Sequence, residues 1–273
     1  MDRANDGSGN SGDANQTDGR VIHDGQALGS DAPIQQATTP LLLSEVVLVG
    51  SGKEYIEIVN PTTAPVDLSQ YYVSDNGNYF KLPLGVATAM ANNFSGDFIA
   101  KFPAGSTIDA HGVVTVAIGT AALFTTTYGV APTYSIADAT LTVLASSTPS
   151  LTDTGEIVVL FQWDGYAPLV KDVDMVLAGV PTPANAVVSK SGVSQSGAMY
   201  ATDANTLPAQ ATAPAAGKST KRLMLETGHE TQLNSGNGID GDDETSEQTT
   251  TTWDTTAMFG APTPGAVPTA LLQ

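Results

Sequence analysis

The sequence predicts an all-β domain, a sandwich or a barrel of many short strands, and three observations support this fold class. Short segments rich in β-branched and aromatic residues recur from residue 41 onward, and Gly, Pro, Asn and Asp separate them. No long segment shows the apolar periodicity of a helix. Hydrophobic residues make up 41 % of the 273 positions, so the chain can supply a packed core.

Strand character is found in seven segments, at 41–49, 54–60, 66–74, 112–119, 156–165, 170–179 and 219–225. Alternation is clearest in the second segment, where Ile56 and Ile58 are predicted to face the core and Glu57 to face the solvent. The segments 98–102 and 121–129 are expected to hold a helical turn at most.

The chain divides into a tail and one domain. Residues 1–40 are rich in Asp, Gly, Asn, Ser and Gln and contain no aromatic residue, so they bury too little surface to offset the entropy of ordering. We predict a disordered tether over 1–40 and a single domain over 41–273. Two stretches of small and mixed residues, 85–101 and 178–218, interrupt the strands and predict long loop insertions.

The charge of the chain excludes several classes of partner. The formal net charge is −18, although only 14 % of the residues are charged. Such a field repels nucleic-acid backbones and anionic membrane surfaces. Cations, basic proteins and neutral glycans remain, so an unidentified protein or glycan is the predicted partner. The absence of cysteine excludes disulfides, thiol catalysis and cysteine-based metal centres.

The N-terminal sequence is the basis for predicting where the protein is located. No apolar run reaches the roughly 18 residues that a membrane helix needs. The first residues, MDRANDGSGN, lack the apolar stretch of a signal peptide and look like the mature start of an exported protein. We therefore expect an extracellular or outer cell-surface location, with a lipid anchor on the full-length protein as one route of attachment.

Seven motifs follow one another between residues 41 and 268. They are LSEVV (43–47), EYIEIVNPTTAPVDLSQYYVSD (54–75), FPAGSTIDAHGVVTV (102–116), LTDTGEIVVL (151–160), STKRL (219–223), TWD (252–254) and TPGA (263–266). Taken in this order they resemble the lamin-tail domain family, in its bacterial secreted form. The chain departs from that family at Gln70 and Tyr71, where Gly-Trp is usual, and in the length of its two insertions.

The resemblance implies an immunoglobulin-like antiparallel β-sandwich without a catalytic signature. Bacterial members resemble accessory or surface modules beside secreted nucleases or esterases. Nuclear relatives contact chromatin, a role that the charge of −18 disfavours here. In such a sandwich at least one of Trp163 and Trp253 is predicted to lie between the sheets, with an exposed, sugar-stacking tryptophan as the alternative.

Catalytic motifs are met only in part. GNGIDG (236–241) has the spacing of a dinucleotide-binding loop, but it follows no clear strand and leads into carboxylates that would repel a pyrophosphate. GVSQS (192–196) lacks the last glycine of a nucleophile elbow. His229 and Glu230 are adjacent, so on a strand they would point to opposite faces. A three-histidine zinc site is disfavoured because His23 lies in the predicted tether.

Calcium is the one cofactor that the sequence suggests. Eight acidic residues and no Lys or Arg lie between Glu226 and Asp254. Hard oxygen ligands for Ca²⁺ would come from Asp240, Asp242, Asp243 and Glu244, with the amides of Asn234 and Asn237 nearby. EF-hand spacing is not met, and the favoured interpretation is a solvated loop that connects two strands.

The predicted function is a non-enzymatic, exported or cell-surface binding module of lamin-tail type. One alternative is a calcium-dependent adhesion domain that uses residues 234–247. A further alternative is an accessory domain of a secreted hydrolase, which has the least support because the residues for catalysis are missing from the sequence.

Overall fold

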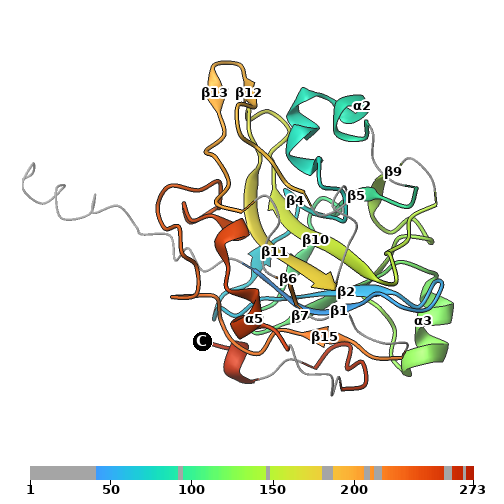
Figure 1. Ribbon diagram of the computed structural model, residues 1–273. Helices are drawn as coiled ribbons and strands as arrows, with labels where there is room; N and C mark the ends of the chain where they lie inside the picture. Colours follow the sequence, from blue (N-terminus) through green and yellow to red (C-terminus); the bar gives the residue numbers. More distant parts are fainter. Residues whose placement is uncertain are drawn as a thin grey trace, which may run out of the picture. The chain divides into compact units, whose positions relative to one another are not determined.

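Figure 1 shows the computed structural model of the chain, which describes residues 41–91, 95–145, 148–179, 187–205, 210–211, 217–254, 260–266 and 269–273. The predicted tether, residues 1–40, lies outside the described residues. Within the described part, no helix has the length and apolar character needed to cross a bilayer.

Two β-sheets make up the domain (Figure 1). The five-stranded sheet has the spatial order β15 (Thr220–Lys221), β1 (Leu42–Val47), β2 (Tyr55–Val59), β7 (Val113–Ala117) and β8 (Tyr134–Ser135). The six-stranded sheet has the order β14 (Gln210–Ala211), β11 (Lys171–Gly179), β10 (Gly155–Gln162), β4 (Tyr71–Ser74), β5 (Phe98–Lys101) and β9 (Thr142–Ala145). Neighbouring strands are antiparallel, except that β7 and β8, and β11 and β14, are parallel. The predicted immunoglobulin-like β-sandwich is confirmed.

Shorter elements connect the strands. A two-stranded sheet pairs β3 (Val66–Asp67) with β6 (Thr107–Ile108), and a hairpin pairs β12 (Ser194–Gln195) with β13 (Ala198–Met199). The described helices are η1 (Tyr79–Leu84), α2 (Val86–Ala89), α3 (Ala121–Tyr128), η2 (Glu244–Ser246), α5 (Thr249–Thr252) and η3 (Thr269–Leu271).

Two segments expected to hold at most a helical turn behave differently. Residues 98–101 form strand β5, which pairs with β4 on one side and β9 on the other, so part of the predicted insertion 85–101 is an inner strand. Residues 121–128 form the eight-residue helix α3. Thr120 caps its first turn by accepting a hydrogen bond from Leu123 N, and Gly129 ends it at φ 78°, which glycine adopts without strain.

The main core lies between the two sheets, and the prediction for Ile56 and Ile58 is confirmed. Both are fully buried there, opposite residues of β10 and β11 such as Val158 and Val176. Trp253 follows α5 and is also buried in this core with 1 % of its surface exposed, as predicted for one of the two tryptophans. Trp163 is only partly buried and packs against a second core.

The prediction that Glu57 faces solvent is wrong. The outer face of the five-stranded sheet is covered, because the C-terminal segment passes over it and α3 packs on its far end. Glu57 is 1 % exposed and accepts hydrogen bonds from Ser44 Oγ at 2.8 Å and Gly265 N at 2.6 Å. Burial raises the pKa of the Glu57 carboxyl to about 7.

A Glu57→Gln substitution is expected to change how stability depends on pH. The folded-state pKa of Glu57 lies above its ordinary value, so the protonated carboxyl favours the folded state. This contribution to the free energy of unfolding is fully present below about pH 4.5 and is lost as the pH rises to about 7. The glutamine amide mimics the protonated carboxyl, so above pH 7 the variant is expected to be more stable by up to about 3 kcal/mol. Urea unfolding from pH 4 to 8 measures this difference, and an equal difference for the exposed Asp153→Asn would contradict it.

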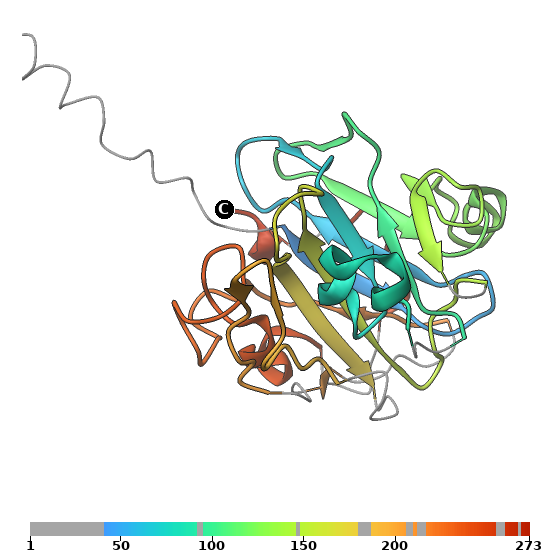
Figure 2. The ribbon, with the colours of Figure 1, turned by 90° about the horizontal axis from the view of Figure 1, so that it is seen from above.

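A second apolar core covers the outer face of the six-stranded sheet. In Figure 2 the turns of η1 and α2 lie in front of this sheet. Phe80 of η1 packs there against Tyr200 of the predicted 178–218 insertion, and Tyr79 of η1 packs against Phe161 of β10. The sheet is thus buried on both faces, which explains why β10 (GEIVVLFQ) reads as a continuous apolar run rather than an alternation.

Candidate functional site

The acidic segment, residues 226–247, packs along strand β11 and is not a solvated loop. Asp172 N donates to Asn237 O at 3.0 Å, and Ile239 N donates to Asp172 O at 2.7 Å, so the segment continues the backbone bonding of β11. In Figure 1 these orange-red coils run beside β11. Four of its acidic side chains are buried, at Glu226, Asp243, Glu244 and Glu247. The favoured interpretation from the sequence was therefore wrong.

A β-bulge in β11 directs two aspartates to opposite faces of the sheet. Leu160 pairs with Asp174 and Phe161 with Asp172, so Val173 is one extra residue on β11. An extra residue shifts the alternation of side chains by one position. Asp174 consequently faces the core between the sheets, and Asp172 faces the outer core.

The inner aspartate belongs to a network around Arg222, which is fully buried. Its guanidinium contacts Asp174 at 2.6 Å and Glu247 at 2.7 Å, and Nε donates to Leu43 O at 2.9 Å. The guanidinium also lies 5.0 Å from the centre of the Trp253 ring. One buried cation therefore joins β1, β11, β15 and the acidic segment, and such pairs are strongly destabilised when one partner is removed.

The outer aspartate belongs to a second network, around Lys190 from the predicted 178–218 insertion. Lys190 Nζ contacts Asp172 at 2.8 Å and Asp203 at 2.7 Å, and all three side chains are buried. Tyr79 OH donates to Asp172 at 2.6 Å. Burial alone would lower the pKa of Lys190, but the charges of the two aspartates raise it above its ordinary value. The insertion is thus held by ionic contacts inside the protein.

Three glutamates of the acidic segment have buried oxygens without a hydrogen-bond partner among the described residues. For Glu244, which is 2 % exposed, this holds for both carboxylate oxygens. It also holds for Glu226 Oε2, which has only Arg222 at 3.9 Å, and for Glu230 Oε1. Burial, with neighbouring carboxylates, raises the pKa of Glu244 well above its ordinary range and that of Glu230 to about 8.

These carboxylates gather into two groups that could hold a metal ion. The inner group consists of Asp174, Glu226 and Glu244, and the outer group consists of Glu230, Asp240 and Asp242. In each group, one carboxylate oxygen from every residue lies within 4.8 Å of those of the other two. Gly238 stands where they meet: a Cβ there would come within 2.9 Å of both Asp240 Oδ1 and Glu244 Oε1. Glycine therefore leaves room for two carboxylates to approach one point.

The predicted calcium ligands divide between these groups and other roles. Asp240 and Asp242 belong to one group and Glu244 to the other, with Gly238 between Asp240 and Glu244, whereas Asp243 belongs to neither group. The Asp243 carboxylate instead accepts hydrogen bonds from Thr245 N and Ala204 N.

The two nearby asparagines supply backbone and structural contacts. Asn234 contributes its backbone N–H, which donates to Asp242 Oδ1 at 2.6 Å, and the Asn237 amide pairs with the peptide groups of Ala201. Sequence reasoning missed Asp174, Glu226 and Glu230 as members of the groups. A carboxylate in the otherwise apolar β11 was the available signal for the first of them.

Two other sequence candidates, GVSQS and His111, belong to neither carboxylate group. GVSQS (192–196) forms the turn into hairpin β12–β13 and opens no helix. His111 Nε2 lies 2.9 Å from Gln273 O at the surface, and His23 is outside the described residues. Neither metal group found among the described residues contains a histidine.

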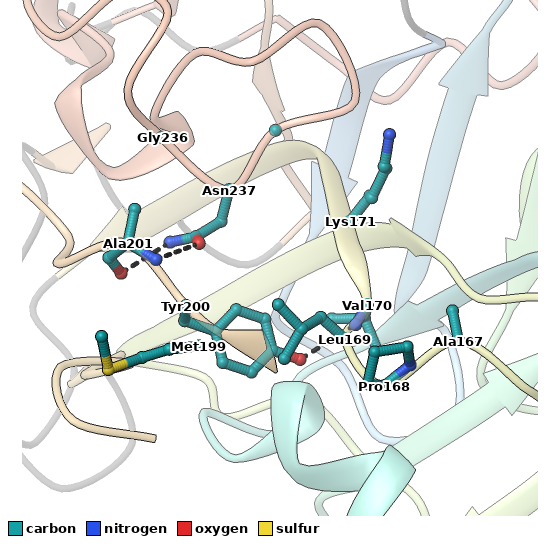
Figure 3. Close-up of a pocket in the computed structure, with 11 residues that line it drawn as sticks. Ala167, Pro168, Leu169, Val170, Lys171, Met199, Tyr200, Ala201, Gly236 and Asn237 are labelled. Atoms are coloured by element: carbon teal, nitrogen blue, oxygen red, sulfur yellow. Dashed lines mark hydrogen bonds between the residues drawn. The ribbon is translucent and has the colours of Figure 1, made fainter. Parts of the chain in front are cut away.

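A cavity of about 500 Å³ borders the acidic segment (Figure 3). Three chain segments line it, namely 167–171 at the start of β11, 199–201 after β13, and 236–238. The Asn237 amide accepts from Ala201 N at 2.9 Å and donates to Ala201 O at 3.0 Å, which fixes two walls to each other. The third wall is fixed by Tyr200, whose hydroxyl accepts from Val170 N at 2.9 Å.

The groups exposed around this cavity are mostly apolar and peptide groups. Lys171 and Tyr200 are its ionisable lining residues, and the Tyr200 hydroxyl is engaged by Val170 N and Phe80 O. Met199 on the rim is 66 % exposed, and Tyr166, directly before the lining segment, is 93 % exposed. A cavity of this size and lining is suited to a small ligand or to part of a larger one.

Comparison with known proteins gives a family and one solved structure. The sequence pattern described as Lamin Tail Domain matches residues 34–171. No curated protein matches the chain. A crystal structure of a DUF4876 family protein from Bacteroides thetaiotaomicron aligns at 15 % identity over 83 % of this chain and 75 % of that chain, with a TM-score of 0.41. The family match ends at the start of β11, before the acidic segment.

Proposed function

The chain belongs to the lamin tail domain family, and from that premise we propose that it is a non-enzymatic binding module of an exported or cell-surface protein. The observation that supports this proposal is the cavity beside β11, whose lining segment 167–171 directly follows the exposed Tyr166 in the sequence. Three fixed walls and an exposed aromatic ring next to one of them in sequence offer a contact surface, because tyrosine supplies a large contact area at a low entropic cost.

The cavity lining favours binding over hydrolysis. General acid–base or nucleophilic catalysis needs at least two ionisable or nucleophilic groups within hydrogen-bond reach of each other. Lys171 and Tyr200 are the ionisable groups that line this cavity, and the hydroxyl of Tyr200 is already engaged on both sides. An accessory domain of a secreted hydrolase would fit the same surface only if its catalytic residues came from another domain.

A neutral glycan is the partner that fits this lining best. The net charge of −18 disfavours anionic ligands at long range, whereas neutral polar ligands are not repelled. Most peptide N–H groups along 199–201 and 236–238 are bonded within the protein, so the lining presents mainly apolar groups together with Lys171, and Tyr166, directly before the lining, offers an exposed aromatic face. A protein partner would use the same apolar rim, so a glycan partner and a protein partner are distinguished by testing each as the ligand.

Tyr166→Ala is expected to weaken glycan binding by about tenfold, because a central aromatic residue often contributes more than 1 kcal/mol to an interface. Stability should change by less than about 0.5 kcal/mol, since the side chain is 93 % exposed. Binding to an array of neutral glycans, followed by titration with a bound one, measures the effect. The matched control is Leu223→Ala, which removes another exposed apolar side chain.

Three results would count against this function. If the protein bound no glycan on the array but captured a specific protein, the partner would be a protein and not a glycan. If Tyr166→Ala and Leu223→Ala lost binding equally, Tyr166 would have no specific part in the contact with the glycan. Hydrolase activity of the purified protein would overturn the non-enzymatic assignment.

A calcium-dependent adhesion domain is the second candidate, and the burial of carboxylates within residues 234–247 favours it over the solvated loop. It differs from the first candidate in one measurable respect. Partner binding would be lost in EDTA and restored by Ca²⁺, whereas a cation-independent module would bind equally in both.

A further inference from the structure

We propose that Glu230, Asp240, Asp242 and Glu244 form a binding site for one divalent cation of the calcium type, where the acidic segment folds against β11. This site deepens the second candidate function without depending on it, because cation binding is measured in the absence of any partner.

The unpartnered carboxylate of Glu244 is the first argument. Its residue is 2 % exposed, and neither oxygen receives a hydrogen bond from the described residues. A buried charge without a partner is among the most costly features a fold can contain, so such groups are normally paired or coordinate a metal. Glu244 Oε1 is directed to the point at Gly238 where Asp240 Oδ1 also arrives.

The local charge balance is the second argument. Arg222 is matched by Asp174 and Glu247, and Lys190 by Asp172 and Asp203. No described lysine or arginine makes an ion pair with any of the four proposed ligands. Asp174 and Glu247 therefore already have a cation, whereas the four proposed ligands, including Glu244 beside Asp174 and Glu226, have no such partner among the described residues.

The geometry of the outer group fits a calcium ion. Ca²⁺–oxygen distances of about 2.3–2.6 Å place opposite ligand oxygens about 5 Å apart. Oxygens of Glu230, Asp240 and Asp242 all lie within 4.8 Å of one another. Asp240 Oδ1 accepts from Asp242 N, and Asp242 Oδ1 accepts from Asn234 N, so backbone hydrogen bonds hold both carboxylates in place.

The ligand chemistry selects calcium over other common cations. All four ligands are hard carboxylates, and neither histidine nor cysteine belongs to the group, which disfavours zinc. An irregular segment of turns suits the flexible coordination of Ca²⁺ better than the strict octahedron of Mg²⁺. The inner group is disfavoured as a second site because Arg222 already places its positive charge there.

Shared protons are the competing explanation for the same cluster. Carboxyl groups buried together can be neutral at pH 7, which would also remove the repulsion among them. The two explanations differ in what added calcium does. A proton-neutralised cluster gains nothing from Ca²⁺, whereas a cation site is stabilised by it.

The test uses the full chain, freed of metal with EDTA and then dialysed, at pH 7.5. Calorimetric titration with CaCl₂ is expected to show one equivalent bound, with weaker or no binding of MgCl₂. Thermal unfolding at about 100 times the measured Kd is expected to rise by about 5–10 °C over EDTA. The double variant Asp240→Asn, Asp242→Asn should lose both effects, and Asp153→Asn, an exposed carboxylate before β10, should keep them.

Glu244→Gln is a second variant that distinguishes loss of calcium binding from loss of folding. Without calcium it is expected to unfold at a higher temperature than the parent protein, because it removes a buried unpaired charge; with calcium it should gain little. The proposal is overturned if the parent protein shows no calcium-specific heat or stabilisation. It is equally overturned if the Asp240, Asp242 and Glu244 variants respond to calcium as the parent does.

Discussion

Replacing Arg222 with methionine is expected to lower the free energy of unfolding by about 3–5 kcal/mol, because it leaves two buried carboxylates without their cation. The guanidinium bonds directly to Asp174 and Glu247 and stacks on Trp253, and none of these groups reaches water. Lysine should not rescue the loss, since it cannot bond to both carboxylates and to Leu43 O in a planar fork. Urea unfolding at pH 7 measures the change.

The neighbouring Lys221 provides the matched control. Its side chain is 22 % exposed and lies 3.4 Å from the buried Glu45, whose carboxylate also accepts hydrogen bonds from Ser219 Oγ and Thr263 N and so keeps partners when Lys221 is removed. Lys221→Met should therefore cost much less than Arg222→Met. Equal costs at the two positions would show that the buried network does not hold the acidic segment to β11.

Lys190→Met is expected to cost a similar amount, about 3–5 kcal/mol, for the same physical reason. Lys190 is the buried cation between Asp172 and Asp203, and its loss would leave both aspartates unpaired beneath Tyr79. The measurement is again urea unfolding at pH 7.

Lys218→Met is the control for this position, since Lys218 is exposed and should change stability by less than about 0.5 kcal/mol. A small effect at Lys190 would mean that residues 187–205 form a loosely attached insertion rather than part of the folded domain. The same result would weaken the case for the cavity, because Tyr200 and Ala201 form one of its walls.

Apolar patterning predicted the sandwich and failed at the buried acids. Ile56 and Ile58 alternate with Glu57, and the rule that one face of an antiparallel strand meets water placed the glutamate outside. The rule failed because β2 is covered on both faces, by the second sheet and by the C-terminal segment. Nothing local to 54–60 shows that a segment more than 200 residues later will cover it.

Local sequence also did not indicate which residues of β11 and which buried cations would lie beside the acidic segment. Asp172 and Asp174 are two residues apart, so simple alternation places them on one face, and the bulge at Val173 separates them. Their cations, Lys190 and Arg222, come from segments that the family pattern over 34–171 does not reach. Charge density between 226 and 254 indicated the segment that contributes most of the two carboxylate groups, but not which carboxylates would be buried.

The sequence alone singled out some members of both carboxylate groups. Asp240 and Asp242 were predicted and lie in one group, and Glu244 was predicted and lies in the other; Asp243 lies beside them in sequence and turns to cap η2. Adjacent residues in a turn point in different directions, so a run of acids cannot contribute all its side chains to one point.

The measurement that tests the account most directly is a crystal structure of the protein grown with CaCl₂, with anomalous diffraction data. The account predicts an anomalous peak bounded by Glu230, Asp240, Asp242 and Glu244, with oxygens at about 2.3–2.6 Å. The contrary result is a map in which these four carboxyl groups hydrogen-bond to one another or to water, with no anomalous signal between them.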